Sequence, residues 1–469
     1  MLPTDLLLKA KIDLYNNVGQ LDGCPGRLSA ELQISPSPQI HWDFQVVGSQ
    51  CLLPDQHFGK EVDISASWFR LDSPLVSGYR NDINSRLVRG PALQAWYGDF
   101  NSTFHEFTFY LPNTRFCEKS WEGQKLIEAK IEERSIGSLE TTWLGHRGEA
   151  RSIESRINDK WAVRLVTKED ALNWLSPMQS NVGTLLTTEG ILYPACAAET
   201  PRPDISSWPA LTLLEAERIL NALSILLSFA DGGYLAPLYI EGRRYSKDPT
   251  VAEVPAATAA SHLVTPLENL GDTWLNHESN LSSYIQCLPA LQKMLSAPPW
   301  DQAFHLVLAW YFQAVQPTPD LSGRMTNWPI AISAVGAALE RLAYTILVQE
   351  EPDASRKSRM QELFEPKKVN PCRPNSEERL YVLLERAGLH PNYGNHVQEF
   401  VYLRNEAVHP KPSSVPKHER PFLLRAAIEW VEELILWRLG YDGRYLHRIA
   451  TDYRSTEPRY DLTERDPGW

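Results

Sequence analysis

A helical pattern meets a proline in the stretch Tyr402-Leu403-Arg404-Asn405-Glu406-Ala407-Val408-His409-Pro410. Apolar residues recur at the spacing of one helix face, at Val397, Phe400, Val401 and Val408. Arg404 falls within this face, where a guanidinium must be paired, must extend its head to water, or must line a cleft that binds an anion. An unbroken helix would hold Arg404 and His409 about 140° apart. Because Pro410 disfavours helical geometry at His409, we expect the last turn to unwind and the imidazole to turn back toward Arg404.

The chain around this stretch is predicted to be entirely helical from about residue 283 onward. Apolar residues with helical spacing predict the segments Tyr284–Ser296, Trp300–Val315, Trp328–Gln349, Ser376–Ala387, Asn395–Val408 and Pro421–Leu439. We expect them to pack as an antiparallel bundle of four or five helices, with the opening stretch on an inner helix.

The front of the chain has the pattern of short strands separated by turns. Alternating or β-branched segments predict strands at Gly26–Ser35, Ile40–Val47, Val62–Arg70, Phe104–Leu111, Lys125–Glu132, Ser138–Leu144, Ala150–Ile157 and Trp161–Val166. About eight strands at this spacing are typical of a sandwich or a distorted barrel.

The middle of the chain is predicted to connect these two regions. A helix is expected over Glu169–Thr188, followed by a proline-rich linker or crossing loop over Tyr193–Ala210. Thr212 and Glu215 form a capping-box pattern that begins another helix. The low-complexity segment Val254–Ala260 is interpreted as an exposed connection.

The sequence therefore predicts a multidomain α+β protein. We expect a β-rich N-terminal domain of sensing or regulatory role at residues 1–190, a linker and helical connecting region at 191–299, and an all-α bundle that carries the motif at 300–469.

Composition narrows the functional classes. The net charge of −12 argues against a protein that coats nucleic acid by bulk electrostatics. Of the 46 basic and 58 acidic residues, 21 and 22 lie in residues 320–469, so the acidic excess belongs to the front and a local basic cleft is compatible with the tail.

The six cysteines form no CxxC pair and the 12 histidines form no HxH or HExxH pair, so we expect neither a metal nor a cofactor. Without a signal peptide or a long apolar run, a cytoplasmic protein with no membrane segment is expected.

Arg404, Asn405 and His409 suit phosphoester chemistry. RNA carries its own nucleophile, the 2′-OH, so neither a metal nor a protein nucleophile is required. A histidine near its ordinary pKa of about 6.5 can take or give a proton at neutral pH. Arginine can stabilise charge that develops on the phosphorane, and Asn405 can orient the imidazole or bind a phosphate oxygen. The Arg-to-His spacing is expected by chance in this chain, so the hypothesis depends on the helical context and on the proline.

In this context, Arg404-Asn405-Glu406-Ala407-Val408-His409 resembles the R-x(4 to 6)-H motif of HEPN domains, in which a polar residue often follows the arginine. The preceding Ala338-Leu339-Glu340-Arg341-Leu342 is similar to the first helix of that fold, and the resemblance covers about residues 300–450. It implies a metal-independent endoribonuclease that works as a homodimer through the C-terminal helical domain, with RNA, tRNA included, as substrate. Glu340 is an ancillary candidate residue.

The combination of a large β-rich front domain with a terminal HEPN domain further resembles ApeA-like proteins of phage defence. That resemblance rests on Pro25-Gly26-Arg27-Leu28-Ser29 and on Leu227-Ser228-Phe229-Ala230-Asp231-Gly232-Gly233. It implies a toxin-like or abortive-infection effector, with a phage-derived or other trigger acting on the N-terminal domain.

A second hypothesis belongs to another class of protein. Arg404 can pair with a core acid such as Glu340, His409 can cap a helix end, and Asn405 can be an ordinary solvated residue. The chain would then be a non-catalytic, dimeric interaction or ligand-binding protein that dimerises through its helical bundle.

Overall fold

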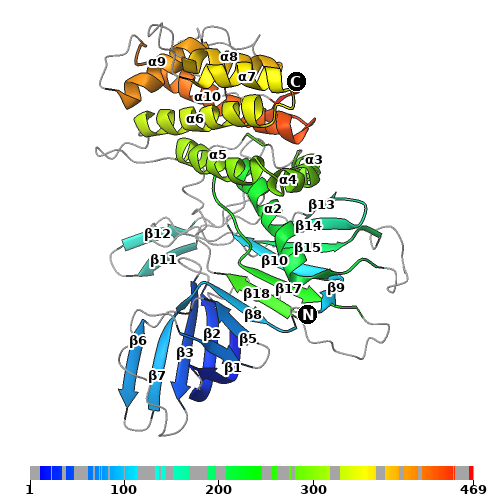
Figure 1. Ribbon diagram of the computed structural model, residues 1–469. Helices are drawn as coiled ribbons and strands as arrows, with labels where there is room; N and C mark the ends of the chain where they lie inside the picture. The colour runs from blue at the N-terminus through cyan, green and yellow to red at the C-terminus, as the bar shows by residue number, and fades with distance from the viewer. Residues whose placement is uncertain are drawn as a thin grey trace. The chain divides into compact units, whose positions relative to one another are not determined.

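The computed structural model describes residues 11–467 with gaps, the longer of which are 34–38, 47–61, 113–131, 144–151, 168–186, 197–207, 246–255, 261–273, 317–327, 366–374, 390–395, 410–414 and 449–463. The chain divides into two units, residues 1–225 with 234–268 and residues 226–233 with 269–469 (Figure 1). The first unit is built on antiparallel sheet and the second on helices. The expected multidomain α+β class is therefore confirmed at this coarse level.

The first unit contains a 14-stranded antiparallel sheet. In spatial order its strands are β13 (Ser152–Arg156), β14 (Trp161–Thr167), β15 (Thr187–Pro194), β10 (Glu106–Pro112), β17 (Tyr239–Arg243), β18 (Ala256–Ala260), β8 (Gln94–Tyr97), β5 (Phe69–Asp72), β4 (Ile64–Ala66), β1 (Lys11–Leu21), β2 (Cys24–Gln33), β3 (Gln39–Val46), β7 (Ser85–Ala92) and β6 (Gly78–Asp82). Two-stranded sheets join β9 (Thr103–Phe104) with β16 (Leu211–Thr212), and β11 (Glu132–Ile136) with β12 (Leu139–Trp143).

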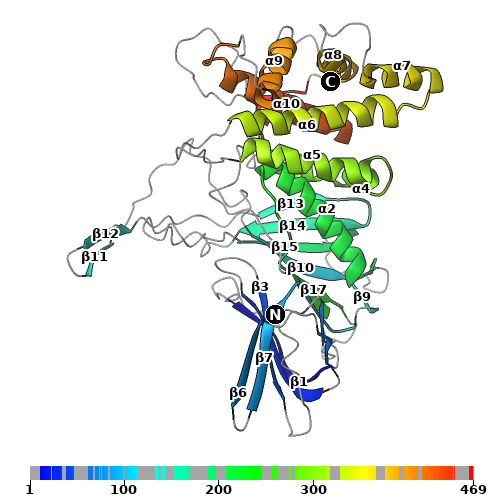
Figure 2. The ribbon, with the colours of Figure 1, turned by 60° about the vertical axis from the view of Figure 1, so that its left-hand side comes forward.

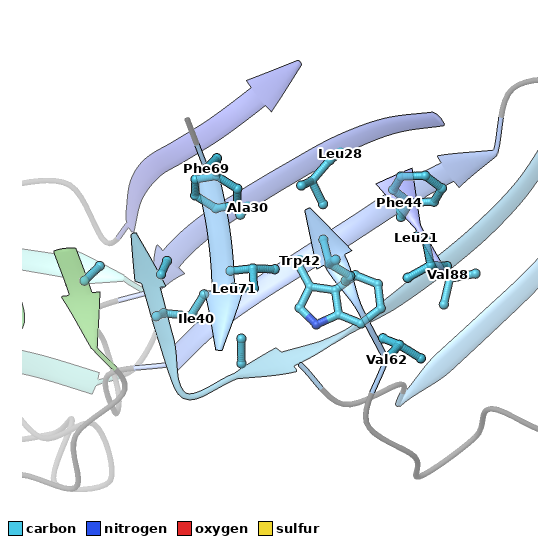
Figure 3. Packing of buried hydrophobic residues seen from close by; sticks show 14 of the residues in the cluster. Leu21, Leu28, Ala30, Ile40, Trp42, Phe44, Val62, Phe69, Leu71 and Val88 are labelled. Carbon is cyan, nitrogen blue, oxygen red and sulfur yellow. The ribbon is translucent and has the colours of Figure 1, made fainter. Parts of the chain in front are cut away.

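Alternating side chains from neighbouring strands form the core of this sheet. In β3, every second residue from Ile40 to Val46 is buried, which is the pattern of a strand with one face on a core. The indole of Trp42 belongs to the same buried cluster as Leu28 of β2 and Leu71 of β5 (Figure 3), and its Nε1 donates to the carbonyl of Pro91 at 3.1 Å. The buried donor is therefore satisfied.

One expectation for the middle of the chain is wrong, and another can be compared with the structure only at its end. Val254–Ala260 was expected to be an exposed connection, but Ala256–Ala260 forms the buried strand β18 between β17 and β8. Small side chains allow a strand to lie in a crowded sheet without any hydrophobic signal in the sequence. The helix expected over Glu169–Thr188 lies mostly outside the described residues, and its last two residues begin strand β15.

The capping-box prediction is confirmed. Helix α2 spans Leu213–Asp231. The Thr212 backbone N–H donates to the Glu215 carboxylate at 2.8 Å, and the Glu215 N–H donates to the Thr212 hydroxyl at 3.3 Å. The backbone N–H and the hydroxyl of Thr212 both donate to the Glu215 carboxylate and lower its pKa.

The second unit consists of helices arranged around α6. Its elements are α3 (Leu281–Ile285), α4 (Leu288–Leu295), α5 (Trp300–Val315), α6 (Trp328–Tyr344) with its π-helical continuation η7 (Thr345–Gln349), α7 (Ala354–Phe364), α8 (Asn375–Arg386), α9 (His396–Val408), α10 (Arg420–Leu439), β19 (Tyr445–Leu446) and β20 (Glu464–Arg465). Helix α6 contacts α5, α8, α9 and α10, and lies between α5 and α9 in both views (Figures 1 and 2).

The helical segments follow the sequence prediction closely, apart from α7. Helix α7 has no buried residue, so it lacks the apolar face by which a helix is recognised in a sequence.

The connecting region expected at 191–299 is shared between the units: β17 and β18 belong to the first and α3 and α4 to the second. Trp328–Gln349 is long and apolar enough to span a membrane, but 67% of its most apolar window is buried, as in the core helix of a soluble protein.

Candidate functional site

Helix α9 carries the motif. Val397, Phe400, Val401 and Leu403 are buried, so most of the predicted apolar face packs against the unit. Val408, which was expected on that face, is 50% exposed, and His409 is exposed as well. The packing of α9 against the unit therefore ends before its last turn. The motif begins in the packed part of the helix and ends at exposed residues.

Arg404 lies against helix α6. Its Nη2 is 3.2 Å from Oε1 of Glu340, and the two side chains are 25% and 34% exposed. A Cβ on Gly336, one turn before Glu340, would lie 3.0 Å from Cγ of Arg404. The glycine thus leaves room for the aliphatic part of Arg404, and Glu340 balances its charge. Arg404 can therefore lie within the apolar pattern because it pairs with Glu340 at a half-open edge of the contact between α6 and α9, where both side chains are partly exposed to solvent.

Asn405 contacts Arg404. Its Oδ1 accepts a long hydrogen bond of 3.4 Å from Nη1 of Arg404. With the described residues, each terminal nitrogen of the guanidinium therefore makes one contact, and a guanidinium has five N–H donors. As far as the described part of the chain shows, most of the N–H donors of Arg404 are available for a further anion.

The helix does not unwind before His409. The His409 backbone N–H donates to the carbonyl of Asn405 at 2.8 Å, which is an ordinary helical bond. Pro410 removes its own N–H and restricts the conformation of His409, but it leaves the His409 donor intact. The two side chains thus leave α9 about 140° apart. Among the described residues, the structure shows no hydrogen bond between the Arg404 guanidinium and the His409 imidazole.

Two residues of helix α8, which the sequence reasoning missed, complete the surroundings of Glu340. The Ser376 hydroxyl donates to Oε1 of Glu340 at 3.1 Å. Arg379 follows one turn later; burial and the charge of Arg404 lower its pKa, and the charge of Glu340 opposes them. Ser376 and Arg379 have the spacing of one helix face, but only the packing of α8 on α6 shows that this face is near Arg404.

A second arginine pair lies close by in the sequence. Glu406 accepts a hydrogen bond of 3.0 Å from Nη2 of Arg420, at the beginning of α10, and the Arg420 guanidinium lies 4.8 Å from the ring centre of Trp328. Glu406, inside the motif, therefore connects α9 to α10. Its role is structural.

Within the described part of the chain, no group of three or more His, Cys, Asp or Glu side chains could hold a metal ion.

The fold and this cluster define a two-unit α+β protein whose helical unit presents a half-open arginine site. The family model of the YopA C-terminal domain matches residues 297–459, which is less than half of the 469-residue chain. The match includes helices α5 to α10 and thus Glu340, Arg379, Arg404, Asn405 and His409. This part of the chain is similar to that domain. No curated protein and no solved structure matches the chain.

Proposed function

We propose that the protein is a metal-independent endoribonuclease of the HEPN type. The observation that carries the proposal is the position of Arg404, which lies in a half-open cluster and keeps most of its N–H donors available. The helical unit would be a HEPN-like bundle, and the front unit a sandwich or barrel-like sensing domain. The resemblance of Arg404-Asn405-Glu406-Ala407-Val408-His409 to the HEPN motif supports this assignment.

The chemistry follows from the residues present. The 2′-oxygen forms a bond to phosphorus while the bond from phosphorus to the 5′-oxygen breaks, which leaves a 2′,3′-cyclic phosphate and a 5′-hydroxyl. A neutral imidazole of His409 takes the proton of the 2′-OH, and an imidazolium gives a proton to the departing oxygen. Arg404 stabilises the charge on the equatorial oxygens, Asn405 holds Arg404, and Glu340 serves as its counter-charge in the free protein.

A homodimer fits this mechanism. One imidazole cannot take one proton and give another in the same step, and the His409 side chain leaves α9 about 140° from Arg404. The exposed last turn, with Val408 half exposed, can approach a second copy of the chain. A partner would supply a second His409 to a site that holds both arginines. The wider role is that of a cytoplasmic toxin-like or antiphage effector that cuts RNA, tRNA included, and responds to a phage-derived or other trigger at the front unit.

Replacing the histidine tests the mechanism. We expect His409→Ala to abolish the formation of RNA ends with 2′,3′-cyclic phosphate, without a change in thermal unfolding or in mass by light scattering. His418→Ala is the matched control, since His418 is also exposed, at 81%, and lies nine residues further along the chain. Cleavage that persists in His409→Ala, or that EDTA abolishes in the wild type, would contradict the proposal.

The second candidate is a non-catalytic, dimeric interaction or ligand-binding protein. The ion pair between Arg404 and Glu340 favours it, because a paired arginine at a helix contact has a sufficient structural reason to be there. In this case Arg404→Ala would lower stability, and the wild type would cleave no RNA under any activating condition.

A further inference from the structure

Arg404 pairs with Glu340, and the hydroxyl of Ser376, one turn before Arg379 on α8, donates to the same carboxylate, so Arg379 lies close to this pair at the contact of α6, α8 and α9. Arg404 is 3.2 Å from Glu340, and Arg379 experiences the charges of both residues. Three other arginines of the unit each pair with a different carboxylate: Arg386 with Glu351, Arg420 with Glu406 and Arg438 with Glu350. Taken together, the charges of Arg379, Arg404 and Glu340 sum to one positive charge.

Arg379 is held in place without using the ends of its guanidinium. Its Nε donates to the carbonyl of Leu363 at 2.8 Å, and its guanidinium carbon lies 4.5 Å from the ring centre of Phe364. In the part of the chain that the structure describes, its two terminal nitrogens make no hydrogen bond. Helix α7, which ends at Phe364, therefore fixes the direction of Arg379 and leaves its paired donors to an incoming anion.

The net positive charge of this cluster indicates that its ligand is an anion. Two guanidinium groups and one carboxylate sum to one positive charge, and an internal phosphodiester of RNA carries one negative charge. Guanidinium donors match phosphate oxygens in geometry, and the Ser376 hydroxyl, on Glu340 in the free protein, is a further donor on the same helix as Arg379. A phosphodiester would complete the cluster without leaving a charge unpaired.

We propose that Arg379, together with Ser376 and Arg404, binds a backbone phosphate of single-stranded RNA, so that α8 is a substrate-binding element. This inference rests on the proposed function, because it assigns Arg379 to the same site. Arg379 is a binding residue that fixes where the RNA chain enters, and Glu340 is the counter-charge with which the phosphate competes for both arginines.

Binding to a short fluorescein-labelled single-stranded RNA tests the assignment. The background is His409→Ala, so that cleavage cannot obscure binding, and fluorescence anisotropy is measured at several salt concentrations. We expect Arg379→Ala in that background to weaken affinity on the order of tenfold and to reduce the slope of log affinity against log salt by about 0.7, the value of one phosphate contact on a single strand. Lys293→Ala removes one exposed cation from α4 of the same unit and should change neither.

The outcomes separate this inference from the proposed function. Unchanged affinity and salt slope in Arg379→Ala overturn the inference, as does an unchanged KM for RNA cleavage in an otherwise wild-type chain, and both leave the nuclease proposal standing. A wild type that cleaves no RNA, together with weaker RNA binding in Arg379→Ala, overturns the nuclease and retains the phosphate site. If Arg379→Ala does not fold, Arg379→Lys decides, since lysine lacks the paired donors and unchanged affinity there overturns the assignment.

Discussion

Two arginine–glutamate pairs of the helical unit differ in how deeply they are buried. Arg448 and Glu432 have side chains that are 6% and 0% exposed, whereas those of Arg404 and Glu340 are 25% and 34% exposed. Arg448 donates to both oxygens of Glu432, from Nε at 3.0 and 2.8 Å and from Nη2 at 2.7 Å. Arg404 makes a single contact of 3.2 Å to its glutamate.

The buried pair belongs to a row of three glutamates on α10. Glu429, Glu432 and Glu433 are all fully buried. The Tyr311 hydroxyl donates to Glu432 and the Tyr445 hydroxyl to Glu433, each at 2.5 Å. The bond from Tyr311 connects α5 to α10, whereas the bond from Tyr445 and that of the Arg448 backbone N–H to Glu429 at 2.8 Å attach the segment after α10 to the helix.

The comparison separates two uses of the same residue types. In the buried pair the described contacts occupy the charged atoms, so the pair specifies one conformation and has no capacity for a ligand. In the half-open pair the guanidinium retains donors and solvent access, so an anion can bind without breaking the fold. Exposure and donor usage, rather than residue type, distinguish the structural arginine from the candidate functional one.

The largest effect is expected from Arg448→Met. The substitution leaves Glu432 buried without its counter-charge, and breaking a buried pair in this way costs about 3–5 kcal/mol of unfolding free energy. Chemical denaturation at neutral pH measures the change. Arg444→Met is the control, because Arg444 and Asp466 are 60% and 79% exposed and such pairs contribute less than about 1 kcal/mol. Equal losses of unfolding free energy in the two variants would show that the buried pair contributes no more to stability than the exposed one.

The cost of Arg448→Met should depend on pH. Burial raises the pKa of Glu432, and Arg448 opposes that rise. A folded-state pKa above the unfolded value of about 4.3 means that the native protein holds a proton that the unfolded chain has released, so stability falls as pH rises above that value. Without Arg448 the pKa rises further, so the fall in stability continues to higher pH and is larger in total. The stability difference from the wild type should therefore shrink between pH 7 and pH 5, and a constant difference would contradict this account.

At the half-open pair, Glu340→Gln should change binding more than stability. The amide oxygen can still accept from Arg404 and Ser376, so we expect the unfolding free energy to change by less than about 1 kcal/mol. Loss of the negative charge should strengthen binding of the labelled RNA several-fold, since the phosphate no longer competes with a carboxylate. Glu385→Gln, an exposed residue of α8, controls for net charge. Weaker binding in Glu340→Gln would show that the carboxylate positions Arg404 instead.

The smallest effect is expected from Gly336→Ala. Alanine favours the helix by about 1 kcal/mol, and crowding against the flexible Arg404 side chain at 3.0 Å offsets part of this gain. Stability should thus change little, while displacement of Arg404 weakens RNA binding a few-fold. Thermal unfolding and anisotropy on the same sample measure both quantities. Unchanged binding would show that Arg404 does not need the space above Gly336.

Periodicity predicted the helices better than the strands. The observed bounds of α5, Trp300–Val315, are those of the predicted segment, because its apolar residues recur over several turns. Strands β15 and β18 escaped prediction, as did β1, which contains Asn16-Asn17 and a glycine and carries little hydrophobic signal. Such strands are defined by their neighbours in the sheet, which the linear pattern does not contain.

For the candidate site, the sequence supplied Arg404, Asn405, His409 and the ancillary Glu340, and the structure brings Arg404 together with Asn405 and Glu340. It places His409 at the exposed end of α9, on another side of the helix. The contribution of Arg379 and Ser376 depends on the packing of α8, which residue types alone do not reveal.

By itself, the sequence determined most helices of the helical unit, the capping box at Thr212 and the unusual position of an arginine within an apolar helix pattern. These are local properties, set by side chains within a few turns of one another. The tertiary structure alone decided that Arg404 lies over Gly336 against Glu340, that α8 brings Ser376 to the same carboxylate and Arg379 close to it, and that Glu432 is buried with Arg448. Burial and charge balance arise from segments distant in the chain, and only folding brings those segments together.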